Sequence, residues 1–315
     1  MVAKALNDMG VDVHVVGPFS DMPGATVHFF NLDTSLRKRF FLGFKASKII
    51  RSLSVSSVVL EGPLLGFRFG KAKIFQFIHD AKFTTEHRRR GGGLLWLYYF
   101  LATRFCDSVI TVSQSEKDRL VGGLRLPSKA IQISRNGLAQ AWLQRQLEDK
   151  EKSFDILYVS NFAKHKGHLR LLQHLRSCKK SVAFVGGDLG TLSQCKEFAR
   201  VNGMNVTFFS GLSTSELIEI YDQSRIFVFP SELEGFGIPY IEARARGLPV
   251  VSSNIPVFSE LSHALGGSVV NFESSSEVLN AIQTALDAER DVPDLSSFTW
   301  ESVCEDFYNI LFSAK

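Results

Sequence analysis

The chain has 315 residues and a mass of 35.1 kDa, a length that suggests two domains at roughly 100–200 residues each. Hydrophobic residues make up 45% and charged residues 22%, which is typical of globular proteins and excludes a disordered or fibrous chain. Four widely spaced cysteines with no CxxC pair argue against a zinc site and a disulfide framework, and they are typical of a reducing cytosol: Cys106, Cys178, Cys195 and Cys304.

Charge is distributed unevenly along the chain. Residues 1–150 carry 22 Lys and Arg against 12 Asp and Glu, whereas residues 151–315 carry 14 against 20. Halves of opposite sign predict different partners, and the basic half favours an anionic surface or ligand. The sequence has no zinc-finger, RRM or basic-zipper pattern, so we expect no nucleic-acid partner.

The apolar runs are too short to cross a membrane. The longest strongly apolar run is Leu94–Ala102, and a spanning helix needs roughly 18–20 residues. The first residues lack the apolar core and the small-residue cleavage site of a signal peptide. We therefore expect a cytoplasmic protein that is not integral to a membrane.

Short apolar runs rich in Val, Ile and Phe alternate with helical stretches along the whole chain. Their composition predicts strands that helices cover on both faces. In the first half the predicted strands are Val11–Gly17, Thr26–Asn31, Ser57–Glu61, Lys73–His79, Ser108–Ser113 and Ala130–Ser134. In the second half they are Asp155–Ser160, Ser181–Gly186, Val206–Ser210, Arg225–Pro230, Pro249–Ser253 and Gly267–Asn271. The alternation predicts two doubly wound parallel sheets.

Helix signals complete the organisation. Ser113-x-x-Glu116 and Ser213-x-x-Glu216 are predicted capping boxes. The polar stretch at residues 138–153 is the predicted linker between domains. Residues 300–312 are predicted to form an amphipathic helix.

The segment Phe227–Glu260 holds the densest group of candidate site residues. A predicted strand is followed by the loop Ser231–Gly237, and Pro239 then opens a helix. Glycines just before a helix start let backbone N–H groups and the helix dipole bind an anion such as pyrophosphate. Glu234 and Glu242 have seven residues between them, and carboxylates suit polyhydroxylated ligands such as a sugar and a ribose. The alternative is that both are solvated surface acids beside ordinary turn glycines.

This segment resembles the signature of family 4 of the retaining glycosyltransferases, in which a strand is followed by PS, EGFG-x-P, E-A and G-x-P-V-V. The matching residues are Glu234, Gly235, Gly237, Pro239, Glu242, Ala243, Gly247, Pro249 and Val250. The resemblance implies an α/β GT-B fold, with two Rossmann-like doubly wound domains and a cleft between them. It implies an acceptor domain over residues 1–145, a donor-nucleotide domain over 154–298, and a helix over 299–315 that crosses back to the first domain.

The same resemblance assigns a donor site. Ile156–Gly167 resembles the family's strand, loop and Lys-Gly, with Lys166 as the cation that clamps the donor pyrophosphate, and a fixed cation stabilises a phosphate leaving group. The partner arginine of the family falls at Asn161 here. By resemblance, Glu234 binds the sugar hydroxyls and Glu242 the ribose. The other donor-binding positions that the resemblance implies are Gly187, Ser210, Gly235, Phe236 and Gly237.

The resemblance also implies an acceptor side and a reaction. His79 ends a predicted strand and would contact the transferred sugar, the alternative being a packing histidine. The implied enzyme is a hexosyltransferase that retains the anomeric configuration and uses neither a metal nor another cofactor. Its donor would be a nucleotide-sugar. Its acceptor would be a glycan or a lipid-linked glycan in the synthesis of cell-surface polysaccharide or lipopolysaccharide.

Two segments suggest an anionic membrane surface as a further partner. Arg37–Phe41 and His87–Arg90 mix or adjoin cations with bulky apolar residues, and the second precedes the run Leu94–Phe100. Such mixtures occur at anionic lipid surfaces and would place the protein peripherally at the inner membrane face. The alternative is that Leu94–Phe105 is a buried helix beneath the strand Ser108–Ser113.

The chain departs from the family at its beginning. Family members start with a strand, a Gly-rich loop and a helix, whereas Met1–Leu6 resembles the middle of that helix, so the amino terminus is expected to be truncated. The first strand of a doubly wound sheet lies mid-sheet, and we therefore expect a gap or a rearrangement in the first sheet. Two alternatives to an active transferase remain. One is a catalytically impaired glycosyltransferase-like binding subunit; the other is a different Rossmann-type nucleotide binder such as a dehydrogenase, although no G-x-G-x-x-G follows a first strand.

Overall fold

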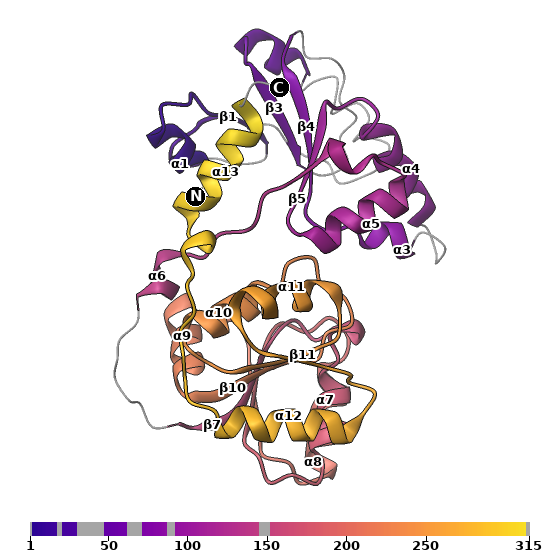
Figure 1. Ribbon diagram of the computed structural model, residues 1–315, viewed down its shortest axis with the longest axis vertical. Coiled ribbons are helices and arrows are strands. Elements are labelled where there is room, and N and C mark those ends of the chain that lie inside the picture. Colours follow the sequence, from indigo (N-terminus) through magenta and orange to yellow (C-terminus); the bar gives the residue numbers. More distant parts are fainter. Residues whose placement is uncertain are drawn as a thin grey trace. The chain divides into compact units, whose positions relative to one another are not determined.

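The computed structural model describes residues 2–17, 21–29, 47–61, 71–86, 92–144 and 152–312. The basic segments Arg37–Phe41 and His87–Arg90 lie outside these residues. Contacts divide the chain into two compact units, one of Met1–Gly137 with Phe298–Lys315 and the other of Leu138–Ser297. Figure 1 shows the elements of each unit.

The second unit is built on one parallel sheet of six strands in the order β12-β11-β10-β7-β8-β9. The strands are β7 (Phe154–Val159), β8 (Val182–Val185), β9 (Val206–Phe209), β10 (Ser224–Phe229), β11 (Val250–Ser253) and β12 (Ser268–Val270). Each agrees within one residue with a run predicted from the sequence. The order reverses direction between β10 and β7. The loops that follow these two strands therefore meet at the switch point, where ligands of open α/β sheets bind.

Helices cover both faces of this sheet, which explains why its strands are continuous apolar runs. Figure 1 shows α10 (Ile238–Ala245) and α11 (Pro256–Leu265) on one face. On the other face lie α7 (His168–Leu175), α8 (Leu192–Val201) and α12 (Ser275–Asp287).

The first unit contains two parallel sheets. One pairs β1 (His14–Gly17) with β2 (Thr26–Phe29). The other has the order β3-β4-β5-β6, with β3 (Ser57–Glu61), β4 (Lys73–Ile78), β5 (Ser108–Thr111) and β6 (Ile131–Ile133). Among the described residues, no strand joins β1 to β3.

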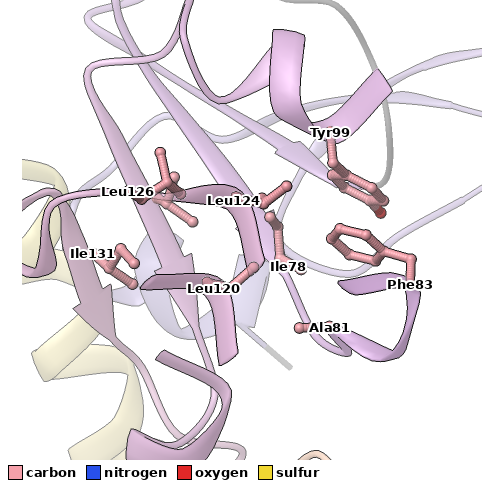
Figure 2. Packing of buried hydrophobic residues seen from close by; sticks show 9 residues of the cluster. Ile78, Ala81, Phe83, Tyr99, Leu120, Leu124, Leu126 and Ile131 are labelled. Atoms are coloured by element: carbon pink, nitrogen blue, oxygen red, sulfur yellow. The ribbon is translucent and has the colours of Figure 1, made fainter. Parts of the chain in front are cut away.

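The core of the larger first-unit sheet lies between its strands and three helices, α3 (Lys82–Glu86), α4 (Gly92–Ala102) and α5 (Gln114–Leu124). Figure 2 shows this cluster. Phe83 and Tyr99 stack with ring centroids 4.2 Å apart and an interplanar angle of 12°. This packing anchors the chain that directly follows β4.

Helix α4 is buried on one face only. Trp96 and Phe100 pack against the core cluster, whereas Leu97 is 45% exposed, Leu101 40% and the following Phe105 61%. Helix α4 thus packs on the core beside β5, as the alternative of a buried helix beneath Ser108–Ser113 expects, while its opposite face is exposed. No helix in the described part of the chain is long and apolar enough to cross a membrane.

The last helix, α13 (Trp300–Phe312), groups with the first unit and confirms the amphipathic helix predicted there. Figure 1 shows it beside α1 (Val2–Asp8). Phe307 on its buried side lies 6.1 Å from Phe77 of β4, measured between ring centroids. The helix therefore helps to cover the sheet that carries β4.

Candidate functional site

Two loops meet at the switch point of the second sheet. The loop after β7 passes through a short 3-10 turn (Lys164–Lys166), and the loop after β10 is Ser231–Gly237. The N–H of Glu232 donates a hydrogen bond of 2.9 Å to the carbonyl of His165 and joins them. Gly167 has φ 73°, and a Cβ at this position would lie 2.5 Å from the carbonyl oxygen of Pro230. Only glycine allows this backbone and this close approach.

Lys166 and Glu234 form an ion pair between these loops. Lys166 Nζ donates to Glu234 Oε1 at 2.6 Å, and the side chains are only 16% and 12% exposed. The hydroxyl of the buried Tyr158 donates to the Lys166 carbonyl at 2.7 Å and fixes the backbone at the lysine. Two residues that the sequence singled out separately are thus brought into one charge-assisted contact.

Gly235, Phe236 and Gly237 lead from Glu234 into α10. Phe236 is buried, and Gly237 is the N-cap of α10 with φ 85° and no side-chain cap. Pro239 has no N–H, and the Tyr240 N–H donates to the Gly237 carbonyl at 2.9 Å, so this end offers mainly the positive end of the helix dipole. The start of α10 is therefore suited to an anion placed beside Lys166.

Asn161, at the position of the family's arginine, braces a neighbouring loop. Its Oδ1 accepts a hydrogen bond of 3.0 Å from the N–H of Gly187, which follows β8. A Cβ on the preceding Gly186 would lie 1.9 Å from the Ser160 carbonyl oxygen, so the two loops touch through their backbones. Ser210 is exposed directly after β9. All these positions follow neighbouring parallel strands and therefore share one edge of the sheet.

Glu242 lies on α10 and faces a residue that the sequence did not single out. The Tyr221 hydroxyl donates to Glu242 Oε2 at 2.9 Å. Burial raises the pKa of Glu242 to about 7, and the hydrogen bond from Tyr221 opposes this rise. The only sequence signal for Tyr221 is its place on the buried side of a helix, which does not distinguish a site residue from a core residue.

His79 lies in the first unit, directly after β4. Its side chain is 53% exposed, its ring lies 4.2 Å from that of Phe77, and Nε2 is 4.0 Å from Glu61 Oε1 at the end of β3. Burial lowers the pKa of His79 from its ordinary value, and Glu61 opposes this shift. Across the residues described, no group of three or more His, Cys, Asp or Glu is arranged to hold a metal ion.

The turn after His79 is held by Glu116 of α5. Glu116 Oε2 accepts a hydrogen bond of 2.7 Å from the N–H of Ala81, and Oε1 pairs with Arg119. Burial raises the pKa of Glu116 to about 7. The sequence predicted a capping box here, and Ser113 does cap α5.

The Glu116 carboxylate, however, reaches across to Ala81 rather than serving only its own helix. The complete reciprocal box forms at the second predicted position, between Ser213 and Glu216.

Two family profiles match consecutive parts of the chain. The Glycosyltransferase Family 4 profile matches residues 1–142, and the profile named Glycosyl transferases group 1 matches residues 141–297. The chain belongs to the family 4 glycosyltransferases. Within this family 4 chain, both Glu234 and Lys166 fall in the part that the group 1 profile matches.

Solved structures show the fold of this family 4 chain. WaaG, a glycosyltransferase involved in lipopolysaccharide biosynthesis, has a TM-score of 0.73 at 17% identity, over 99% of this chain and 94% of that one. HepE from Anabaena, in complex with UDP and glucose, has a TM-score of 0.65 at 17% identity, over 92% and 82%. The GT-B fold predicted from the sequence is confirmed.

Curated relatives match at higher identity over shorter lengths. The O-antigen chain mannosyltransferase RfbU of Salmonella typhimurium is 29% identical over 165 residues, which are 51% of this chain and 46% of the relative. The chain spans about half the length of the curated relatives that it matches first.

Proposed function

We propose that this family 4 glycosyltransferase moves a hexose from a nucleotide-sugar to a glycan or lipid-linked acceptor in the synthesis of cell-surface polysaccharide. The observation that carries the proposal is the Lys166–Glu234 pair, 2.6 Å apart and beside the uncapped start of α10. An anion site next to a hydroxyl-binding carboxylate suits a diphosphate joined to a sugar. The names of RfbU and WaaG, and the UDP and glucose bound by HepE, support the same assignment.

In this proposal the bond between the sugar and the diphosphate breaks, and the diphosphate leaves with the bonding electrons. Lys166 and the start of α10 stabilise the charge that develops on it. Because Lys166 is already paired with Glu234, the diphosphate shares or replaces that carboxylate as the partner of the cation. Glu234 then has acceptor capacity for the sugar hydroxyls. Glu242 takes the ribose hydroxyls.

We propose further that the acceptor hydroxyl attacks from the face that the diphosphate leaves and gives its proton to the departing diphosphate, so that the anomeric configuration is retained, with His79 touching the sugar. Lys166 supplies the positive charge at the leaving group, and the proposed reaction therefore uses no metal ion and no other cofactor. The anomeric coupling constant of the product by NMR tests retention. Full turnover in excess EDTA tests the metal assignment.

The alternative of a catalytically impaired binding subunit is less well supported. The lysine and the carboxylate that the reaction needs are both present and in contact, and RfbU and WaaG are named as transferases.

The test is turnover by the purified chain with UDP-, GDP- and ADP-hexoses, read as release of the nucleoside diphosphate with and without lipid-linked acceptors. Glu234→Gln is expected to lower turnover about 100-fold or more, the usual effect of removing a group that stabilises a transition state. Glu232→Gln is the matched control, since Glu232 lies in the same loop, pairs with Arg170 and is 57% exposed. An unchanged rate in Glu234→Gln, or no turnover with any donor, contradicts the proposal.

We also propose that the first unit contacts an anionic membrane surface. Leu97 and Leu101 are large, exposed and one turn apart on α4, and the exposed Phe105 and Arg104 follow the end of that helix. Co-sedimentation with anionic vesicles is expected for the wild type and lost in the double variant Leu97→Ser, Phe105→Ser. Leu189→Ser removes a residue that is 65% exposed in the other unit and serves as the control. Binding to neutral vesicles alone, or no binding, contradicts the proposal.

A further inference from the structure

Tyr221 lies in the last turn of α9 (Thr214–Asp222) and is completely buried, yet its hydroxyl bonds to a partly exposed carboxylate. It donates a hydrogen bond of 2.9 Å to Glu242 Oε2. Among the residues that the structure describes, Tyr221 is the hydrogen-bond partner of the Glu242 side chain. The second oxygen, Oε1, is not among the buried polar atoms that lack a partner. The carboxylate is therefore bonded on one side and accessible on the other.

The ring of Tyr221 is held on two sides. It stacks on Phe227 of β10, with centroids 5.7 Å apart and an interplanar angle of 13°. It also meets the ring of Trp142 edge to face, with ring centroids 5.1 Å apart and an interplanar angle of 84°. Trp142 belongs to α6 (Gln140–Leu143), the short helix within the predicted linker, and is 5% exposed. A ring packed in this way presents its hydroxyl at one place only.

The next residue ties the same helices together a second time. Asp222 forms a bidentate ion pair with Arg246, in which the arginine side chain is 2% exposed. Arg246 follows α10 and also donates to the carbonyl of Gln144 at 3.0 Å. The end of α9 is thus fixed to α10 through Tyr221–Glu242 and through Asp222–Arg246, and the position of the Tyr221 hydroxyl relative to Glu242 is rigid.

In this contact Tyr221 is the hydrogen-bond donor and Glu242 is the acceptor. Burial raises the pKa of Tyr221 well above its ordinary value, so the phenol remains protonated and acts as the donor. A hydrogen bond to the carboxylate favours the ionised form of Glu242 against the burial that favours the neutral form. An ionised carboxylate is an acceptor only, with about four acceptor positions. One is used by Tyr221, and the others are available to hydroxyl groups of a ligand.

We propose that Tyr221 is a positioning residue that orients the Glu242 carboxylate to accept the two ribose hydroxyls of the donor nucleotide. The inference rests on the proposed function, which assigns the ribose to Glu242. Without the Tyr221 hydroxyl, Oε2 loses its fixed donor, the carboxylate can rotate, and protonation removes an acceptor. Recognition of the ribose then weakens, while the diphosphate contacts of Lys166 are untouched.

The experiment compares ligands with and without those hydroxyls. Dissociation constants of UDP, GDP and their 2′,3′-dideoxy forms are measured by calorimetry for the wild type, Tyr221→Phe and Glu242→Gln. Tyr240→Phe is the matched control, because Tyr240 is also completely buried and its hydroxyl donates to the Gly266 carbonyl at 2.7 Å, away from Glu242. Thermal melts of both phenylalanine variants report folding, which the retained ring packing favours.

For the better-bound nucleotide, the wild type is expected to prefer the ribose form about tenfold or more, since a site that loses a hydrogen-bonding partner is left with unpaired polar groups. Tyr221→Phe is expected to reduce this ratio toward that of Glu242→Gln, and Tyr240→Phe to keep it. A merely structural role for Tyr221 would weaken both forms equally and leave the ratio unchanged. As the pH is lowered, Glu242 is protonated and the preference for the ribose form is expected to decline. In Tyr221→Phe this decline is expected to begin at a higher pH than in the wild type, because the hydrogen bond that favours the ionised carboxylate is lost.

The ribose role of Glu242 and the positioning role of Tyr221 are contradicted by different results. If the wild type binds ribose and dideoxy forms equally, or if Glu242→Gln keeps the wild-type ratio, the ribose role of Glu242 is wrong and the inference is overturned with it. If the wild type discriminates, Glu242→Gln does not, and Tyr221→Phe retains the full ratio, then the ribose role stands and the positioning role of Tyr221 is overturned.

Discussion

Candidate residues of the second unit are hydrogen-bonded to one another, whereas His79 in the first unit lies beside Glu61, which is not a candidate residue. Lys166 is bonded to Glu234, and Asn161 is bonded to Gly187. His79 is half exposed and has the carboxylate of Glu61 4.0 Å away. A site whose members brace one another is oriented before a ligand arrives, which lowers the entropic cost of binding.

The sheets that carry these residues also differ between the two units. The second unit has six consecutive parallel strands in one sheet, and the switch point lies between the central pair β10 and β7. In the first unit, the described strands form two sheets, and the turn after His79 is fixed by the carboxylate of Glu116 on α5. The anion-binding residues thus follow directly from the strand order of one sheet, while the turn after His79 is held by helices, through Glu116 of α5 and the packing of Phe83 on Tyr99.

The largest expected effect tests the bracing of the second unit. Arg246→Met leaves Asp222 without its buried partner and is expected to lower the free energy of unfolding by about 3–5 kcal/mol, as removal of one member of a buried pair does. Arg225→Met is the control, because Arg225 is 43% exposed in its pair with Asp155 and an exposed pair contributes about 0–1 kcal/mol. Urea unfolding gives both values. Equal losses of unfolding free energy in the two variants would mean that the buried and the exposed ion pair contribute equally to stability.

The next effect is catalytic. Lys166→Ala removes the cation beside the start of α10 and is expected to reduce kcat about 100- to 1000-fold. Lys164→Ala, an exposed lysine in the same 3-10 turn, is expected to change kcat little. Steady-state release of the nucleoside diphosphate measures both. A large loss in Lys164→Ala with a small one in Lys166→Ala would reverse the assignment of the clamp.

A smaller effect compares one buried carboxyl in each unit. The pKa values of Glu116 and Glu242 are both raised to about 7 in the folded chain. Between about pH 4.5 and pH 7 the folded form retains protons that the unfolded form has released, so the free energy of unfolding falls as the pH rises, by about 1–3 kcal/mol for each group.

Glu116→Gln and Glu242→Gln each remove one of these contributions. Urea unfolding at pH 5 and pH 7.5 is therefore expected to show a smaller pH dependence in each variant than in the wild type. A pH dependence that neither variant changes would mean that these carboxyls do not titrate in that range.

The smallest effect concerns His79. Glu61→Gln removes the charge that opposes the burial shift, so the pKa of His79 is expected to fall further. The titration of the His79 ring protons by NMR measures it. A titration midpoint that is unchanged or higher in the variant would mean that the charge of Glu61 does not raise the pKa of His79.

The second unit was more predictable than the first. All six of its strands were placed within one residue because each is a largely apolar run with Gly, Pro or Ser at one end or both, which are local signals. In the first unit, the run predicted at Val11–Gly17 forms a strand only from His14, and the helix after Gly92 has an exposed apolar stripe that composition alone does not separate from a buried face.

By itself, the sequence determined the alternation of strands and helices, the spacing of Glu234 and Glu242, and the membership of family 4, because each is a property of neighbouring residues. Only the tertiary structure decided the partners. Lys166 meets Glu234 because β7 lies beside β10, and Tyr221 meets Glu242 because α9 and α10 are tied together at their ends. A contact between distant positions depends on strand order and helix packing, and these are set by the burial of the whole sheet rather than by any local pattern.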